Sequence, residues 1–81
     1  SSGQKDWGID IGTYPSRFTA DKILIKTALS EMISLEGSLR KVVKNKYGFR
    51  ATFLGLSKVK AKQACERLIN RNVNCEIIGP G

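Results

Sequence analysis

Hydrophobic and polar residues alternate at two places in the chain, near its beginning and near its end. Residues 7–12 carry an apolar side chain at every second position, with Asp10 on the opposite face, and this pattern predicts a half-buried strand. The same alternation returns over residues 73–78 and predicts a last strand. Both strands are expected to turn one face to a core and the other to solvent.

Between and after these strands, apolar residues recur at helical spacing in two segments. The first helix is expected to be capped by Thr19 and to end at Gly37, and a second helix over residues 58–71 is expected to be capped by Ser57. The apolar positions of the first helix are Ala20, Leu24, Ala28, Met32 and Leu35. We interpret this stripe as core, and a protein–protein adaptor that uses the first helix stays as an alternative.

Residues 39–45 and 49–55 predict a hairpin with Gly48 in the left-handed position of a three-residue loop. This loop pairs Val43 with Ala51 and directs Val42 to the solvent face. Lys41 is left facing inward, and an edge strand would let its long side chain reach water. A change of one residue in the loop would reverse the whole second strand.

The element order is β-α-β-β-α-β, and the strand–glycine–helix unit occurs twice. We predict an α+β fold of the split β-α-β-β-α-β type, ferredoxin-like or RNP-like, with a four-stranded antiparallel sheet and both helices on one face. Its open face is expected to show Asp10 beside Arg50 and Thr52, with Thr13 at the end of the first strand. An open face on a basic domain is usually a binding surface.

The chain has 81 residues, which is one domain. Residues 1–5 are interpreted as a linker or cloning remnant ahead of a domain over 6–79, and the whole as a fragment of a longer protein. No apolar run approaches the ~20 residues that span a bilayer. The net charge is +7, and residues 40–62 carry eight basic side chains and no acidic one, a pattern that attracts polyanions but also suits a solvated surface.

The chemistry for catalysis or metal binding is sparse. There is no histidine, and the two cysteines, Cys65 and Cys75, have the wrong spacing for zinc. Both are expected to point into the space between the second helix and the last strand. Two alternatives remain: a disulfide, which would be stable only in an oxidising compartment, or two buried free thiols. We expect no enzyme activity, no cofactor and no metal.

Two blocks of residues resemble the SPOR (sporulation-related repeat) family. Residues 9–14, Ile-Asp-Ile-Gly-Thr-Tyr, followed by Ala20, are similar to its first strand and helix start. Residues 49–53, Phe-Arg-Ala-Thr-Phe, with the turn at Gly55 and a helix containing Ala64 and Leu68, are similar to its third strand and second helix. The family's usual glutamine is Asp10 here, and a carboxylate can only accept hydrogen bonds.

The resemblance implies the fold derived above and a role in bacterial peptidoglycan binding. Members bind glycan strands stripped of stem peptides and target wall-remodelling or cell-division proteins, in the periplasm or cell envelope. The cysteine pattern resembles modules at the C-terminus of D-alanyl-D-alanine carboxypeptidases. A monomeric domain that binds glycan without a membrane span of its own is therefore expected.

The expected glycan-binding residues come from the resemblance and from the open face. The resemblance indicates Asp10 and Thr13, and the face adds Arg50 and Thr52 as polar partners. Arg50 could hold a ligand carboxylate or pair with Asp10. The remaining candidates are Val42 and Leu54 as apolar ground and Tyr14, which could stack on a sugar ring or close the core.

A nucleic-acid-binding domain of the RRM type is the main alternative, because it shares the strand order and the basic charge. Tyr47-Gly48-Phe49 resembles part of its RNP1 motif. However, RRM sheets stack bases on aromatic side chains, and the central position here is Asp10, whose charge would repel phosphates.

Overall fold

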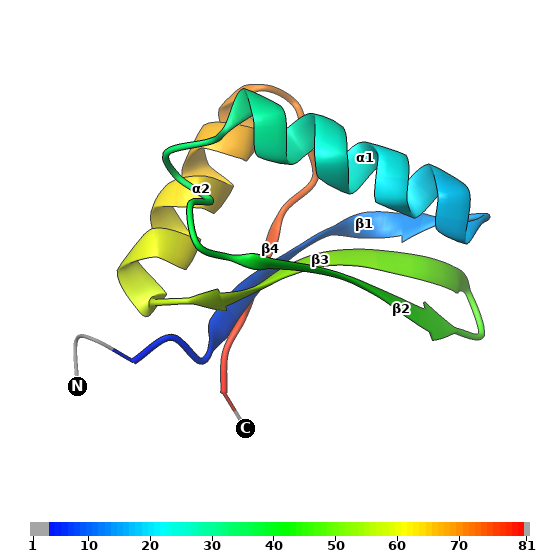
Figure 1. Cartoon of the computed structure of the whole chain (residues 1–81), viewed down its shortest axis with the longest axis horizontal. Helices are drawn as coiled ribbons and strands as arrows, with labels where there is room; N and C mark the ends of the chain where they lie inside the picture. Colours follow the sequence, from blue (N-terminus) through cyan, green and yellow to red (C-terminus); the bar gives the residue numbers. More distant parts are fainter. Residues whose placement is uncertain (1–3, 81) are drawn as a thin grey trace.

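One sheet covered by two helices forms the part of the chain that the computed structural model describes, residues 4–80 (Figure 1). The linker or cloning remnant expected at residues 1–5 lies mostly outside these residues. The elements in chain order are β1 (Trp7–Tyr14), α1 (Arg17–Ser30), β2 (Leu39–Asn45), β3 (Gly48–Leu56), α2 (Lys58–Asn70) and β4 (Glu76–Ile78).

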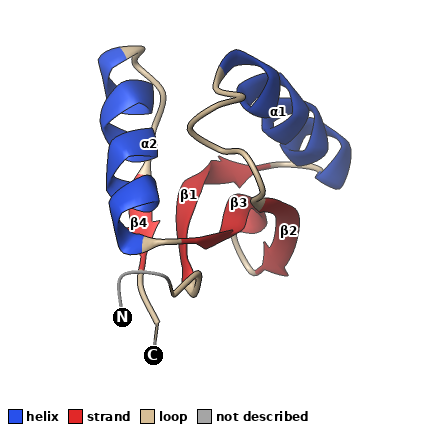
Figure 2. Ribbon diagram, turned by 60° about the vertical axis from the view of Figure 1, so that its left-hand side comes forward, coloured by secondary structure: helices blue, strands red, loops and turns tan. Residues whose placement is uncertain are grey.

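The four strands pair antiparallel in the order β2-β3-β1-β4, so the two strands that begin each β–α unit lie in the centre. Both helices lie on the same side of this sheet (Figures 1 and 2). The predicted α+β fold with the order β-α-β-β-α-β is confirmed. Within residues 4–80, neither helix is long and apolar enough to cross a membrane.

The core lies between the helices and the sheet. Ile9 and Ile11 of β1 are fully buried, as the alternation predicted, and Phe53 of β3 is the largest fully buried side chain. The remaining buried apolar residues are Ala20, Leu24, Leu35, Ala51, Leu56, Ala61, Ala64, Cys65 and Leu68. Burial of these side chains is the main stabilising contribution that such a small domain has.

The first helix differs from its prediction at both ends. Ser16, not Thr19, is the cap, because its Oγ accepts a hydrogen bond from the Thr19 backbone N at 3.1 Å. The helix ends at Ser30 and not near Gly37, since Glu31 leaves helical geometry and turns its carboxylate toward Arg67 of α2 and Arg71 at the end of α2. Met32, expected in the core, is therefore exposed.

The hairpin register also differs by one residue. Asn45 pairs with Gly48, which leaves a two-residue loop in place of the expected three, and the Asn45 Oδ1 accepts a hydrogen bond from the Tyr47 N at 2.8 Å. Val43 consequently pairs with Arg50. The predicted orientation of the second strand was wrong, and Lys41 points to the open face.

The last strand is shorter than predicted and pairs only with β1. A disulfide between Cys65 of α2 and Cys75 fixes the segment that leads into β4, with 5.3 Å between the two Cα atoms. This link holds β4 beside β1, which is the strand that carries Asp10.

Candidate binding face

Three cross-strand rows of side chains form the face of the sheet opposite the helices, called the open face below. The first row is apolar and contains Leu39, Leu54, Gly8 and Ile78. The second contains Lys41, Thr52, Asp10 and Glu76, one residue from each strand. The third contains Val43, Arg50 and Thr13. Directly paired residues share a face, so the strand pairing fixes all three rows.

Gly8 gives the apolar row its flat surface. A Cβ atom on this residue would lie 2.8 Å from Leu54 Cδ2 and 2.5 Å from the Phe53 carbonyl oxygen. Because no side chain occupies this space, Leu54 lies across β1 and joins the two central strands into one apolar platform.

The centre of the open face is an ion pair. The Arg50 Nε donates a hydrogen bond to Asp10 Oδ2 at 2.6 Å, and the backbone N of Gly12 donates to Asp10 Oδ1 at 2.8 Å. Both carboxylate oxygens are therefore engaged, and the Asp10 side chain is only 15% exposed. Arg50 is 38% exposed and remains accessible, so it can meet a ligand while Asp10 orients it.

A bulge in β1 positions this pair. The register between β1 and β3 shifts between Asp10 and Thr13, and Gly12 has a φ of +118°, which glycine adopts without strain. The bulge turns the Gly12 amide toward the Asp10 carboxylate and brings exposed Thr13 opposite Arg50.

Three of the predicted glycan contacts are not available on this face. Val42 pairs with Ala51 and packs against the core, because the register differs from the expected one. Thr52 lies on the open face but is 2% exposed, and its hydroxyl donates to the Lys41 carbonyl oxygen at 2.8 Å. Neither residue can contact a bound sugar directly.

Tyr14 is the third predicted glycan contact that is not available on the open face, because its side chain closes the core. Its ring packs against the buried cluster and its hydroxyl donates to the Ile11 carbonyl oxygen at 2.7 Å. Burial, assisted by the negative charge of Asp10, raises the pKa of the Tyr14 hydroxyl above its ordinary value. The neutral hydroxyl thus stays a hydrogen-bond donor to the backbone.

Four exposed residues of the open face were missed in the sequence: Leu39, Lys41 and Val43 on β2, and Glu76 on β4. The three on β2 were misassigned by the one-residue register error. Lys41 was the signal that could have revealed the error, because a register with the three-residue loop turns its charged side chain toward the core.

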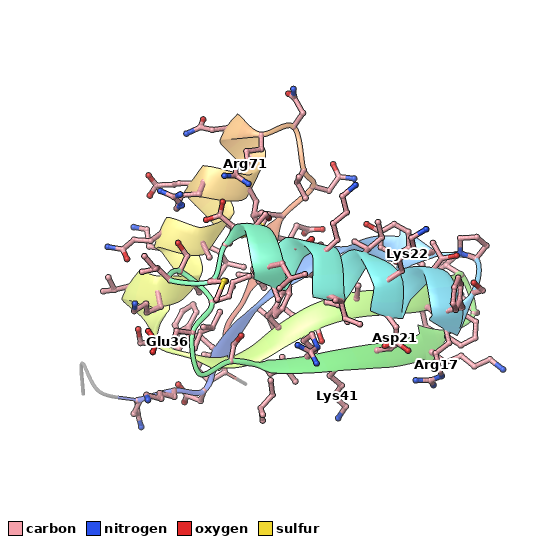
Figure 3. The ribbon with its side chains drawn as sticks, turned by 45° about the horizontal axis from the view of Figure 1, so that its top comes forward. Arg17, Asp21, Lys22, Glu36, Lys41 and Arg71 are labelled. Carbon is pink, nitrogen blue, oxygen red and sulfur yellow. A yellow bond between two sulfur atoms is a disulfide. The ribbon has the colours of Figure 1, made fainter. Side chains whose placement is uncertain are left out.

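Positive charge is concentrated at the β2 edge of the sheet. Arg40, Lys41, Lys44 and Lys46 all lie on β2 or its turn and are exposed. Figure 3 shows Lys41 extending from β2 away from the helices. On the open face itself Asp10 neutralises Arg50, and this ion pair has Lys41 on its β2 side and exposed Glu76 on its β4 side.

Aromatic side chains are placed elsewhere. Within residues 4–80, none lies on the open face, and Phe53 is in the core. Phe49 packs against the core from the helix side, with Arg17 and Lys44 over its ring. Tyr47, at the hairpin tip, is 77% exposed and adjoins the β2 edge.

Comparisons with protein-family models, with curated proteins and with solved structures give no match. Because the fold alone does not determine function, the function must be inferred from the chemistry of the open face.

Proposed function

We propose that this chain is a non-catalytic module that binds glycan strands of bacterial peptidoglycan on the open face of its sheet. The observation that carries the proposal is a sheet face that the helices leave uncovered, on which an aliphatic platform adjoins an oriented arginine and a lysine. Sugar rings and acetyl methyl groups can pack on Leu39 and Leu54, while cations can pair with carboxylates.

The preferred form of the ligand follows from the charge distribution. Removal of stem peptides leaves a free lactyl carboxylate on each muramic residue, so the stripped strand carries a row of negative charges. On β2, Lys41 extends from the open face, while Arg40 and Lys44 alternate with it on the helix side of the same edge strand. We propose that the strand lies across the open face with its carboxylates toward β2, and that this interaction targets the parent protein to the wall in the cell envelope.

The disulfide supports this location. A cross-link between Cys65 and Cys75 persists in oxidising compartments such as the periplasm, and is rare in the cytosol. An RRM-like nucleic-acid binder is less well supported, because base stacking needs aromatic side chains on the sheet and the open face carries none among residues 4–80.

Isolated sacculi are the direct test. The domain should sediment with sacculi, and removal of the stem peptides by an amidase should increase the bound fraction. Raising the salt concentration should weaken binding to the stripped material, since exposed charges are screened. Absence of binding to either preparation, or tighter binding to single-stranded RNA, would refute the proposal; equal binding before and after amidase treatment would refute only the stripped-strand preference.

The charge-reversal variant Lys41→Glu is expected to reduce affinity for stripped sacculi by about tenfold, because it replaces an attraction by a repulsion next to Arg50. Lys62→Glu is the matched control, since Lys62 is also exposed but lies on α2. Both variants should unfold at the same temperature as the wild type. Equal affinities of the two variants would exclude the β2 side as the site of carboxylate contact.

A further inference from the structure

Helix α1 is apolar on two sides. Ala20 and Leu24 face the sheet and are buried, as a helix in this fold requires. On the outer side, Phe18 is 77%, Ile25 49% and Leu29 67% exposed. A surface helix normally has a polar outer face, so these three side chains form an unpartnered apolar surface.

The spacing of the outer residues is that of a helix–helix seam. Phe18, Lys22, Ile25 and Leu29 follow one another at alternating steps of four and three residues. This is the a/d pattern by which one helix packs along another. Asp21 and Lys26 complete the lining of a shallow groove along these residues.

Charged side chains interrupt and border the groove. In Figure 3, Asp21 and Lys22 extend from α1 in different directions. Beyond the end of the helix the exposed apolar surface continues through Met32 and Ile33. The surface therefore extends along the whole helix, about 21 Å for its 14 residues, as a strip rather than a broad patch.

Charge on the strip is predominantly positive. Arg17, Lys22 and Lys26 are exposed on or beside it, against one acidic residue, Asp21. Lys22 occupies a seam position, where it needs an acidic or polar group opposite. A second copy of α1 would bring three further cations against these, so charge disfavours self-association through this helix.

We propose that the outer face of α1 docks an amphipathic helix of a partner protein, with apolar residues along its seam and acidic residues beside them. A membrane surface fits less well, because a helix that lies in the interface presents a wide apolar face, and here Lys22 interrupts a strip only one seam wide. The strip and the open face lie on opposite sides of the molecule, so the module could hold a partner while bound to glycan.

The test uses a designed helical peptide of about three heptads with leucine at a and d and glutamate at e and g, whose like charges limit its self-association. Its matched control carries lysine at e and g. The glutamate peptide should shift the NMR amide signals of α1 and bind at least about tenfold more tightly than the lysine peptide. Leu29→Ser should weaken binding by about tenfold, whereas Val59→Ser, at an equally exposed position on α2, should not.

Two results with the peptides would overturn the proposal: unchanged NMR amide signals of α1 with the glutamate peptide at millimolar concentration, or equal binding of both peptides. Two other results would assign the surface to another occupant and overturn it as well: dimerisation of the domain that depends on Leu29, or binding to vesicles of anionic phospholipid, in place of the peptide, that depends on Leu29. Leu29→Ser should retain sacculus binding and its melting temperature. Failure of the glycan proposal therefore leaves this one untouched, and the reverse also holds.

Discussion

Glu31→Gln is expected to destabilise the domain by about 2–3 kcal/mol at pH 7, because it removes the charge from a buried carboxylate that holds two arginines. The Glu31 side chain is 0% exposed. Its Oε1 accepts a hydrogen bond from the Arg67 Nε at 2.5 Å, and its Oε2 lies 3.2 Å from the Arg71 Nε. Arg67 belongs to α2 and Arg71 follows the last residue of that helix, where Figure 3 shows it. The pair of contacts ties the end of α1 to α2.

This stabilisation should depend on pH in a defined direction. Burial of the Glu31 carboxylate works to raise its pKa, but the hydrogen bond and charge of Arg67, the charge of Arg71 and the Ser34 hydroxyl outweigh it and lower the pKa. A lowered folded-state pKa means that the contribution is fully present above the unfolded pKa of about 4.5 and is lost as pH falls through the folded value.

Denaturant unfolding between pH 7 and pH 2.5 measures this effect. The difference in unfolding free energy between wild type and Glu31→Gln should be largest at neutral pH and should shrink toward zero in acid. Glu36→Gln is the matched control, since Glu36 is exposed in the same connection between α1 and β2. A constant difference at all pH values would mean that the ion pairs contribute nothing beyond packing.

The strand order and the core could be predicted from the sequence because they follow from short-range periodicity. The alternation around Ile9 and Ile11 admits only one buried face, and both residues are fully buried. The repeated strand–glycine–helix unit left little freedom in topology. By contrast, the end of α1 depends on Glu31 meeting Arg67 and Arg71, which lie 36 and 40 positions away, and no local pattern contains that contact.

The open face was predicted in part. Asp10 and Arg50 do lie together, because both sit on the central strands whose pairing the topology fixes. The β2 residues could not be assigned, because the segment from Asn45 to Gly48 suits a two-residue and a three-residue loop almost equally well. The two loop lengths turn opposite faces of β2 toward solvent. Thr52 shows a second gap: alternation gives the face of a residue, but not whether neighbouring side chains cover it.

The outer surface of α1 shows a third kind of gap. The stripe that was interpreted as core contains residues that are buried, such as Leu24, and one that is not, Met32. Apolar residues on two sides of a helix produce no clear amphipathic direction, so periodicity cannot tell which side faces the sheet. Only the packing of α1 against β3 and β2 distinguishes the two sides.

Reduction of the Cys65–Cys75 disulfide is expected to lower the unfolding free energy by about 3 kcal/mol, because the cross-link closes a loop of about ten residues that the reduced, unfolded chain is free to open. For a domain with so small a core this is a large part of its stability. The loss of stability should appear first in β4, a three-residue strand that pairs only with β1.

Amide hydrogen exchange with and without a reductant locates the effect. Protection of the β4–β1 ladder at Gly8, Asp10 and Ile78 should fall before that of the β1–β3 ladder, because β3 is paired on both of its sides. The double variant Cys65→Ala, Cys75→Ala should match the reduced wild type and should not respond to the reductant. If the wild-type protein keeps its stability and its β4 protection after complete reduction, packing alone holds β4. The cross-link would then not support the assignment of the module to an oxidising compartment.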